Sequence, residues 1–586
     1  MVTLRLLTSV ATLPLQPELV VVGNHDGSNH EGFVHFGKHM KTKSVSAVSP
    51  LLYALRDDTV DRILLAPGRY TVGKTLVMKR SVVLEAEVAG TVVLWGNSTC
   101  PLGLFEGTQY AHGHSECKHV SERVIDVPPG VLPDLQLEFI GLNITGGYGV
   151  DGNGGGVRIS GGRARFTNCN IYENIAQADL HGVPSEDTIA GGGGGLAIEG
   201  AAVVNLTGCN IHTNNVLGGS GAGVLIRGGK VRFSRCKIFR NGKSSDAHVP
   251  LLRAGGGLRV EGGDVVVDGC SLNANRGSGL ALSREATVLV NGSKIFDNNA
   301  SEGAGVYQAS LVSVLAVYNS KIFRNNATTG GGLSVGNASI NGAEIFANSA
   351  DRGGGVYVTK RASVMLASSQ IHHNKAAKAG GGAFVFYLAK ATVTNSTFKE
   401  NAVTSGHENG SGSGIYARCS STVRLIRDKF VSNPPKSGGD DVFVQHVADS
   451  SVTDAEAKAY CSAASTMGLA VTSVCIEEDV AGQTIIQKSM SSANISVECP
   501  KELDDLDNCQ GRSCAPATLG AVLIVFLIAV ALGLCLCGCY YQKLAKTDEA
   551  SGLVSGKPSY RCDPGSCIFA CIGCCVRDEP KKGAKN

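Results

Sequence analysis

The chain has 586 residues, including 76 glycines, 17 prolines and one tryptophan, and 18% of its residues are charged. A hydrophobic content of 43% argues against a disordered protein, and the glycines lack the three-residue period of collagen. The 53 Lys and Arg residues nearly balance the 50 Asp and Glu residues, so a net charge of +3 gives no overall field that would attract nucleic acid.

The first 49 residues form an N-terminal segment with weak signals. Met1–Leu15 contains one arginine and a short apolar run but no small-residue cleavage site, so it is read either as an atypical signal peptide or as a chain that lacks its natural start. Pro50–Leu55, Asp61–Tyr70 and Ser81–Leu94 are expected to alternate strands and turns. Residues 112–119, HGHSECKH, contain histidine and cysteine side chains that could bind zinc. We prefer a disulfide between Cys117 and Cys100. For the whole chain we predict no metal and no cofactor.

A repeat recurs ten times between residues 154 and 433, within the segment 50–444 that we predict to be a β-helix. Each copy reads small-Gly-(Val, Leu or Ile)-x-apolar, then an apolar strand, then (Cys or Ser)-x-(Ile or Phe)-x-x-Asn, as in GGGVRI…TNCNIYEN and GAGVYQ…YNSKIFRN. The ten copies are spaced by 23 to 40 residues and close at Asn174, Asn214, Asn241, Asn275, Asn298, Asn325, Asn348, Asn374, Asn401 and Asn433. Each copy is therefore predicted to form one coil of a parallel β-solenoid.

The physical argument favours a solenoid over a β-sandwich. The short strands of one repeat cannot bury their inward faces alone, whereas coils stacked at ~4.8 Å bury a continuous core and pair the backbone of each coil with the next. Glycines supply the positive-φ turns, and the recurring asparagine is expected to stack into a hydrogen-bonded ladder. A coil of about 23 residues is longer than the coils of left-handed hexapeptide-repeat solenoids, so it favours a right-handed β-helix. The predicted fold class is all-β: a right-handed parallel β-helix followed by one transmembrane helix.

The repeats resemble a known family. The Gly-Gly-Gly-(Leu or Val) and (Ile or Phe)-x-x-Asn elements resemble the GGA-(Ile, Leu or Val) and FxxN repeats of chlamydial polymorphic outer-membrane proteins, and the opening segment resembles the N-terminal coils of the pectate-lyase-like superfamily. This resemblance covers residues 50 to 444 and implies a right-handed β-helix capped by a short helix. It also implies adhesion. It ends at the C-terminus, where a hydrophobic segment replaces that family's autotransporter domain and excludes its secretion route.

Repeat positions are expected to form columns along the solenoid. One inward column begins with four cysteines and continues mainly with serine: Cys169, Cys209, Cys236, Cys270, Ser293, Ser320, Ala343, Ser369 and Ser396. Buried thiols are the preferred interpretation, because in-register parallel neighbours suit disulfide geometry poorly. Two stacked disulfides are the alternative.

Two further columns are aromatic and expected to face outward. The first is the predicted ligand-binding set, Tyr307, Tyr357, Phe384 and Tyr416, with Ser334 between the first two tyrosines. The second contains Tyr172, His212, Phe239, Asn273, Phe296, Phe323, Phe346 and His372. Repeating outward rings are suited to stacking on sugars or contacting a partner protein, although they can equally pack on one another or lie beneath a loop.

Glu199, Arg227 and Glu261 are weak catalytic candidates. They are expected at one repeat position in three consecutive coils, which would separate the carboxylates by ~9.6 Å, near the upper end for inverting glycoside hydrolysis. An alternating ion-pair ladder is the simpler interpretation. The longest insertions, Ile175–Ala190 and Gly242–Ala254, both follow the asparagine turn and are expected to contact partners at one edge.

The C-terminal part predicts a single-pass membrane anchor. Residues 445–514 form a stalk with five cysteines, and Ala515–Tyr541 is an uncharged apolar run long enough to cross a bilayer. The tail, residues 542–586, holds eight Lys and Arg against five Asp and Glu, which places it in the cytoplasm. Cys535, Cys537 and Cys539 at the inner boundary are candidates for S-acylation, and free thiols are the alternative. The five cysteines between Cys562 and Cys575 suit zinc poorly.

Ten N-x-(Ser or Thr) sequons support an N-terminal part that is extracellular or lumenal. All ten precede the apolar run: Asn97, Asn143, Asn205, Asn291, Asn299, Asn326, Asn337, Asn395, Asn409 and Asn494. The predicted location is therefore the plasma membrane or another membrane of the secretory pathway. The favoured function is non-enzymatic recognition or adhesion, with a glycan or a surface protein as ligand and no nucleic acid as partner. The alternatives are a carbohydrate-active enzyme of the pectate-lyase-like superfamily and a structural coat protein.

Overall fold

The computed structural model describes residues 40–97, 122–131, 133–150, 152–177, 191–217, 219–242, 255–404, 412–419, 421–433, 441–445, 473–477 and 486–488. The chain divides into two units, residues 1–499 and residues 500–586, and the second unit lies wholly outside these ranges. None of the helices within the described ranges is long and apolar enough to cross a membrane. The predicted span, residues 515–541, and Cys535, Cys537 and Cys539 fall outside the described residues, so their predictions stay open.

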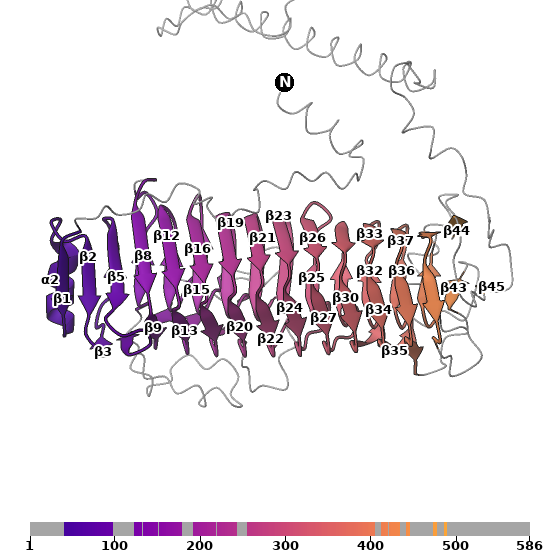
Figure 1. Ribbon diagram of the computed structural model, residues 1–586, viewed down its shortest axis with the longest axis horizontal. Helices are drawn as coiled ribbons and strands as arrows, with labels where there is room; N and C mark the ends of the chain where they lie inside the picture. The colour runs from indigo at the N-terminus through magenta and orange to yellow at the C-terminus, as the bar shows by residue number, and fades with distance from the viewer. Residues whose placement is uncertain are drawn as a thin grey trace, which may run out of the picture. The chain divides into compact units, whose positions relative to one another are not determined.

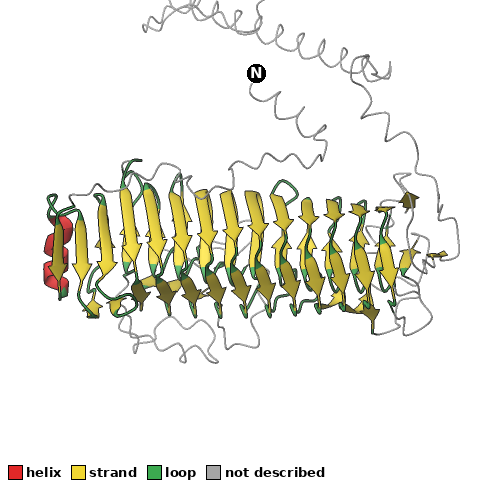
Figure 2. Cartoon of the chain, viewed as in Figure 1, coloured by secondary structure: helices red, strands yellow, loops and turns green. Residues whose placement is uncertain are grey.

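The described residues of the first unit form a stack of coils in which strands of successive coils pair in parallel (Figure 1). Each regular coil contributes one or two strands to a large sheet and one strand to a narrow sheet on another side (Figure 2). The large sheet comprises β1 (Thr42–Val45), β2 (Arg62–Leu65), β4 (Leu76–Val77), β5 (Val82–Ala86), β7 (Ile125–Val127), β8 (Gln136–Ile140), β11 (Val157–Ile159), β12 (Arg163–Thr167), β15 (Leu196–Glu199), β16 (Val203–Thr207), β19 (Val224–Ser234), β21 (Leu258–Asp268), β23 (Leu280–Asn291), β25 (Val306–Gln308), β26 (Val314–Tyr318), β28 (Leu333–Val335), β29 (Ala338–Asn341), β32 (Val356–Val358), β33 (Ser363–Ala367), β36 (Ala383–Phe386), β37 (Lys390–Thr394), β40 (Ile415–Arg418), β41 (Thr422–Ile426), β43 (Val442–Gln445), β44 (Ser473–Glu477) and β45 (Ile486–Lys488).

The narrow sheet contains one strand per coil. Its strands are β3 (Gly68–Thr71), β6 (Val92–Trp95), β9 (Leu142–Thr145), β13 (Asn170–Tyr172), β17 (Asn210–His212), β20 (Lys237–Phe239), β22 (Ser271–Asn273), β24 (Lys294–Phe296), β27 (Lys321–Phe323), β30 (Glu344–Phe346), β34 (Gln370–His372), β38 (Thr397–Lys399) and β42 (Lys429–Val431). Two small sheets follow the asparagine turn: β10 (Tyr148–Gly149), β14 (Ile175–Gln177) and β18 (Asn215–Leu217), and further along β31 (Ser349–Arg352), β35 (Lys375–Ala379) and β39 (Ala402–Val403). The predicted parallel β-solenoid is confirmed.

A short helix, α2 (Val48–Arg56), lies at the N-terminal end of the stack (Figure 1). Leu51 and Ala54, one turn apart, are buried against the first coils, as the apolar spacing of a short amphipathic helix requires. Arg80 donates hydrogen bonds from its guanidinium to the carbonyls of Ala54 and Leu55 and so stabilises the C-terminal end of the helix. The capping helix implied by the family resemblance is confirmed. The prediction of strand and turn at Pro50–Leu55 is wrong, because this segment is helical. The first strand begins earlier, at Thr42.

The core is built from side chains that alternate inward along each strand. Ile295, Ile322 and Ile345 occupy the central position of three successive narrow-sheet strands, and none of the three is exposed to solvent. Burying one such side chain contributes roughly 1.5–3 kcal/mol relative to leaving it exposed. Because each coil repeats this contact, the core continues along the whole described stack.

The closing asparagines form a continuous hydrogen-bonded ladder. Asn298 donates from its backbone N–H and its side-chain amide to Oδ1 of Asn325, and Asn325 does the same to Asn348, at distances of 3.0–3.1 Å. The Nδ2 group of Asn325 also donates to the carbonyl of Ile295. The same pattern runs from Asn174 to Asn433, and all ten asparagines are buried. The predicted ladder is confirmed.

The glycine triplets are required because successive turns pack backbone against backbone. A Cβ atom at Gly355 would lie 2.5 Å from the carbonyl oxygen of Gly382 in the next coil. The preceding Gly353 has a φ of +64°, a conformation that other residues adopt only at a cost. The triplet therefore fixes both the turn and the close approach of two coils.

The cysteine and serine column is buried, as predicted. Cys169, Cys209, Cys236 and Cys270 are free thiols with at most 3% exposure, so the alternative of two stacked disulfides is wrong for these four residues. Hydrogen bonding to the neighbouring thiol, together with burial, raises the pKa of Cys209 and of Cys236 to about 12. Cys209 and Cys236 therefore stay protonated at neutral pH and act as packing groups rather than nucleophiles.

Candidate functional site

The weak catalytic candidates lie on the large sheet and form one ion-pair network. Arg227 lies 3.8 Å from Glu199 and 3.0 Å from Glu261, and Glu261 also accepts a hydrogen bond of 2.9 Å from Arg259. The side chains of Glu261 and Arg259 are only 4% and 7% exposed. Each of the two carboxylates therefore contacts the same arginine between them, and the ion-pair interpretation fits this geometry better than a pair of catalytic acids.

One detail of the predicted position is wrong. Glu199 pairs with Arg227 in register, but Arg227 pairs with Gly262 rather than with Glu261. The register shifts at this point of β19 and β21, which moves Glu261 by one residue along its strand. Glu261 nevertheless contacts Arg227 across this shift, and it also contacts Arg259, two residues away on the same strand.

A second cluster of charged side chains lies on the same sheet, and the sequence alone did not predict it. Asp126 on β7 accepts hydrogen bonds from Arg158 on β11 at 2.7 and 3.0 Å, and Arg123 lies 3.4 Å away. Asp126 is 7% exposed. Its partner could have been found only from the strand register, because the pair joins residues 32 positions apart that face each other across adjacent coils.

The predicted ligand-binding column is only partly accessible. The rings of Tyr357, Phe384 and Tyr416 stack with centroids 5.3 and 5.0 Å apart, whereas Ser334 separates Tyr307 from Tyr357. Tyr307 and Tyr357 are half-buried, but Phe384 and Tyr416 are each only 1% exposed. These two rings form a small apolar cluster with Ala379 at the end of β35. The expectation of an exposed ring is therefore wrong for Phe384 and Tyr416, because the neighbouring segment packs on them.

The second aromatic column is accessible along the narrow sheet. Phe296, Phe323, Phe346 and His372 form an uninterrupted stack with centroids 4.8–5.0 Å apart and interplanar angles of 2–9°. A shorter stack joins Tyr172, His212 and Phe239, and Asn273 separates the two stacks. All of these rings are half-buried, and the rings inside each stack have both faces against their neighbours. We call this set the narrow-sheet ladder.

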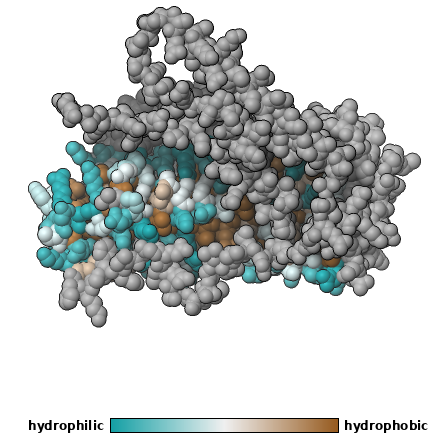
Figure 3. Space-filling model, turned by 90° about the horizontal axis from the view of Figure 1, so that it is seen from above, coloured by the Kyte–Doolittle hydropathy of each residue, from teal (hydrophilic) through white to brown (hydrophobic). Residues whose placement is uncertain are grey.

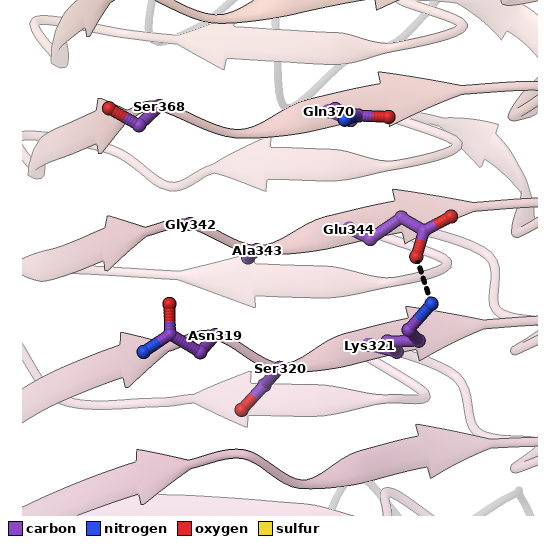
Figure 4. A pocket seen from close by; sticks show the side chains of 8 residues that line it. All are labelled: Asn319, Ser320, Lys321, Gly342, Ala343, Glu344, Ser368 and Gln370. Carbon is purple, nitrogen blue, oxygen red and sulfur yellow. Dashed lines mark ion pairs between the residues drawn. The ribbon is translucent and has the colours of Figure 1, made fainter.

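A depression of about 350 Å³ lies beside this ladder, at the bend between the large and narrow sheets (Figure 4). It is lined by Asn319, Ser320, Lys321, Gly342, Ala343, Glu344, Ser368 and Gln370. Lys321 and Glu344 form an ion pair of 2.5 Å on adjacent coils, and His372 lies 3.2 Å from Glu344. The contact with Lys321 lowers the pKa of Glu344, and burial lowers the pKa of His372. Within the described ranges no group of three His, Cys, Asp or Glu side chains is arranged to hold a metal ion.

The predicted glycosylation sites differ in accessibility. Four of the described sequon asparagines are exposed, at Asn299, Asn326, Asn337 and Asn395. Asn97, Asn205 and Asn291 are half-buried, and Asn409 and Asn494 lie outside the described residues. Asn143 is 8% exposed, donates to the carbonyl of Gly90 and accepts from Asn170. Seen from above, hydrophilic and hydrophobic side chains both reach the described surface of the stack (Figure 3).

Comparison with known proteins supports the fold. The family described as the right-handed β-helix region matches residues 136–322. No curated protein matches the chain. The chain is similar to the Dettilon tailspike protein gp208, with 14% identity over 68% of this chain and 64% of the tailspike and a TM-score of 0.36. It thus spans less than two thirds of the tailspike.

Two enzymes are also among the similar structures. The first is the pectate lyase Pel9A, with 15% identity over 71% of this chain and 82% of that chain and a TM-score of 0.27. The second is the A-module of the Azotobacter vinelandii mannuronan C-5 epimerase AlgE6, with 14% identity over 68% of this chain and 93% of that module and a TM-score of 0.30. With TM-scores below 0.5, these three likenesses carry no conclusion about this chain. The family match and the parallel coils together establish an all-β, right-handed parallel β-helix.

Proposed function

We propose that this chain is a single-pass membrane protein whose β-helix recognises a glycan or a surface protein without chemically changing it. The narrow-sheet ladder carries the proposal. Its rings are held at a fixed spacing by the parallel strands beneath them, and each ring keeps part of its surface accessible. A rigid array of this kind can contact an extended ligand with little loss of conformational entropy.

The charged residues of the large sheet favour recognition over catalysis. A general acid or base must reach the reacting atoms, but Glu261 is nearly buried and contacts two arginines. Glu199 is engaged by Arg227 and by the hydroxyl of Ser160 at 3.3 Å. The alternative is a carbohydrate-active enzyme, a class that includes the pectate lyase and the epimerase to which the chain is similar in fold.

The membrane anchor and the location are inferred from the sequence. The apolar run of residues 515–541 and the basic tail that follows it support a span with the β-helix outside the cytoplasm. Four sequons on exposed described residues are compatible with N-glycosylation of such a domain. S-acylation of Cys535, Cys537 and Cys539 would add to the anchoring.

The test is a glycan and cell-surface-protein binding screen with the full chain in detergent micelles, combined with mass spectrometry of every bound sugar. Binding with unchanged sugars is the expected result. The Phe296→Ser/Phe323→Ser variant should bind at least about tenfold more weakly, because ligand contact with the accessible part of each ring is worth about 1 kcal/mol. A matched control, Tyr53→Ser, changes an exposed ring on α2. Cleaved or epimerised sugars would instead support the enzyme, and a chain that binds neither glycan nor protein would support a structural coat.

A further inference from the structure

The middle of the narrow sheet carries a concentration of positive charge. On the four coils that close at Asn241, Asn275, Asn298 and Asn325, the outward side chains of the narrow-sheet strands and of the residues flanking them include six basic groups. They are Arg235, Lys237, Arg240, Lys294, Lys321 and Arg324. Asp297 is the one acidic group at these positions. All seven side chains are exposed. The chain as a whole has a net charge of +3, so this local excess is not a consequence of composition.

The strand register places like charges beside one another. Lys294 on β24 pairs directly with Lys321 on β27, one strand spacing away. Lys321 contacts Glu344 on its far side, whereas Lys294 and Lys237 make no ion pair with any described residue. Like charges directly opposite in a sheet are unfavourable unless a counter-charge compensates them. Lys294, which lies beside Lys321 without a described counter-charge of its own, is therefore the place where an acidic ligand group would be stabilised most.

Phe296 and Phe323 of the ladder lie between two lysines and Arg324. Lys294 and Lys321 precede Phe296 and Phe323 by two residues, on the same outward face of their strands. On the other side, the Arg324 guanidinium lies 5.0 Å from the centroid of Phe323 and 5.7 Å from that of Phe296, and Asp297 holds it with two hydrogen bonds of 2.8 Å. A cation row, a ring row and an arginine thus run side by side along the stack.

The distribution of sequons leaves the same face open. Among the described narrow-sheet strands, the one sequon asparagine is Asn143 on β9, and it is buried and hydrogen-bonded. The exposed sequons lie outside these strands, at Asn299 and Asn326 after the asparagine turn, at Asn337, and at Asn395 in the turn before β38. Glycans on these residues would therefore be attached outside the strands that carry Phe239, Phe296 and Phe323.

We propose that this basic strip, made of Lys237, Lys294, Lys321, Arg324 and the rings of Phe239, Phe296 and Phe323, binds a linear acidic glycan that lies along the axis of the coils. Sugar rings contact the phenylalanine edges, while carboxylate or sulfate groups contact the lysine row. The proposal rests on the recognition function proposed above and specifies its ligand. A linear chain is favoured because Lys294 and Lys321, and likewise Phe296 and Phe323 with centroids 4.8 Å apart, follow one another along the coil axis. Lys237 and Phe239 continue the same two rows beyond Ser271 and Asn273 of the intervening strand.

The experiment measures binding of the full chain in micelles to three immobilised polymers by surface plasmon resonance. They are heparin as the sulfated probe, polygalacturonate as the carboxylated probe and dextran as the neutral probe. The expected result is binding to at least one acidic polymer and none to dextran, with affinity that falls as salt concentration rises. Lys294→Gln/Lys321→Gln should weaken binding by about tenfold.

A matched control keeps the test specific. Lys230→Gln/Lys390→Gln removes two exposed lysines from the large sheet and should leave binding unchanged. Thermal unfolding of each variant confirms that the coils remain folded. Acidic-polymer binding that both double variants reduce equally would overturn the strip as the site. Binding to dextran alone would overturn the acidic ligand while leaving non-enzymatic recognition intact. Failure to bind any glycan or protein would overturn both proposals.

Discussion

Two aromatic columns run along the same solenoid, and they differ in what covers them. The column of Tyr357, Phe384 and Tyr416 on the large sheet and the narrow-sheet ladder have similar ring spacings and both project away from the core. Phe384 and Tyr416 are nevertheless buried in a cluster with Ala379 of β35, while Phe296 and Phe323 stay half-buried at the surface. The position of a residue in the repeat thus determines that its side chain leaves the core, but the neighbouring segment determines whether solvent reaches it.

The sharpest test of this contrast replaces one ring in each column. Phe384→Ala should lower the free energy of unfolding by about 3–5 kcal/mol, because it removes a fully buried ring and leaves a cavity between Tyr357 and Tyr416. Phe323→Ala should cost about 1 kcal/mol, since its ring is already partly in water. Urea unfolding followed by circular dichroism measures both values. Equal losses would contradict the difference in coverage.

The asparagine beneath the exposed ladder should matter more than the ring itself. Asn325→Ala is expected to cost about 2–4 kcal/mol, because it leaves the backbone N–H and amide of Asn298 without their acceptor in a buried site. Asn326→Ala, at the adjacent exposed position, is the matched control and should change stability by no more than ~0.5 kcal/mol. If Asn325→Ala lowers the free energy of unfolding no more than Phe323→Ala does, the asparagine ladder contributes little to stability.

A buried acid ends the cysteine and serine column and should make stability depend on pH. Asp428 accepts hydrogen bonds from the backbone N–H groups of Ser396 and Ile426, but burial raises its pKa from 3.8 to about 6. Its folded pKa is above its unfolded pKa, so the stability it contributes is complete below about pH 4 and is lost as pH rises through about 6.

Asp428→Ser restores the residue type of the column and should remove that dependence. A shift of this size corresponds to about 3 kcal/mol at neutral pH, so the variant should be more stable than the natural protein by up to about that amount at pH 7. The lost hydrogen bond to Ile426 reduces the gain. Urea unfolding of both proteins at several pH values between 4 and 7 measures how the free energy of unfolding depends on pH. Identical pH profiles for both proteins would exclude Asp428 as the source.

The charged network of the large sheet should give the smallest effects. Glu199→Gln removes the 3.8 Å ion pair between Glu199 Oε1 and Arg227 Nη1. It is expected to lower the free energy of unfolding by less than ~1 kcal/mol and to leave ligand binding unchanged. Glu261→Gln is the companion variant, and it should cost more because the side chain is nearly buried against two arginines. Loss of a sugar-modifying activity in the Glu199 variant would reverse this order and identify the large sheet as an active site.

The amino-acid sequence determined the repeat and nearly everything that follows from it. A closing asparagine with a mostly constant interval, an inward Ile or Phe and a glycine triplet specify one coil, because each coil must present the same faces to its neighbours. The buried thiols, the amide ladder and the two aromatic columns were therefore predictable. The Lys-Ile-Phe triplets at Lys237, Lys294 and Lys321 were also visible, but only the register showed that two of these lysines are neighbours.

The tertiary structure decided what covers each column and how neighbouring coils are offset. Pro50–Leu55 became a helix because Leu51 and Ala54 cap the open end of the core, a role that no local strand pattern reveals. Arg227 faces Gly262 instead of Glu261 because the pairing of β19 and β21 shifts there, and Tyr416 is buried in a cluster that includes Ala379 at the end of β35. Such contacts join segments far apart in the chain, so they depend on how the coils stack rather than on the residues of any one coil.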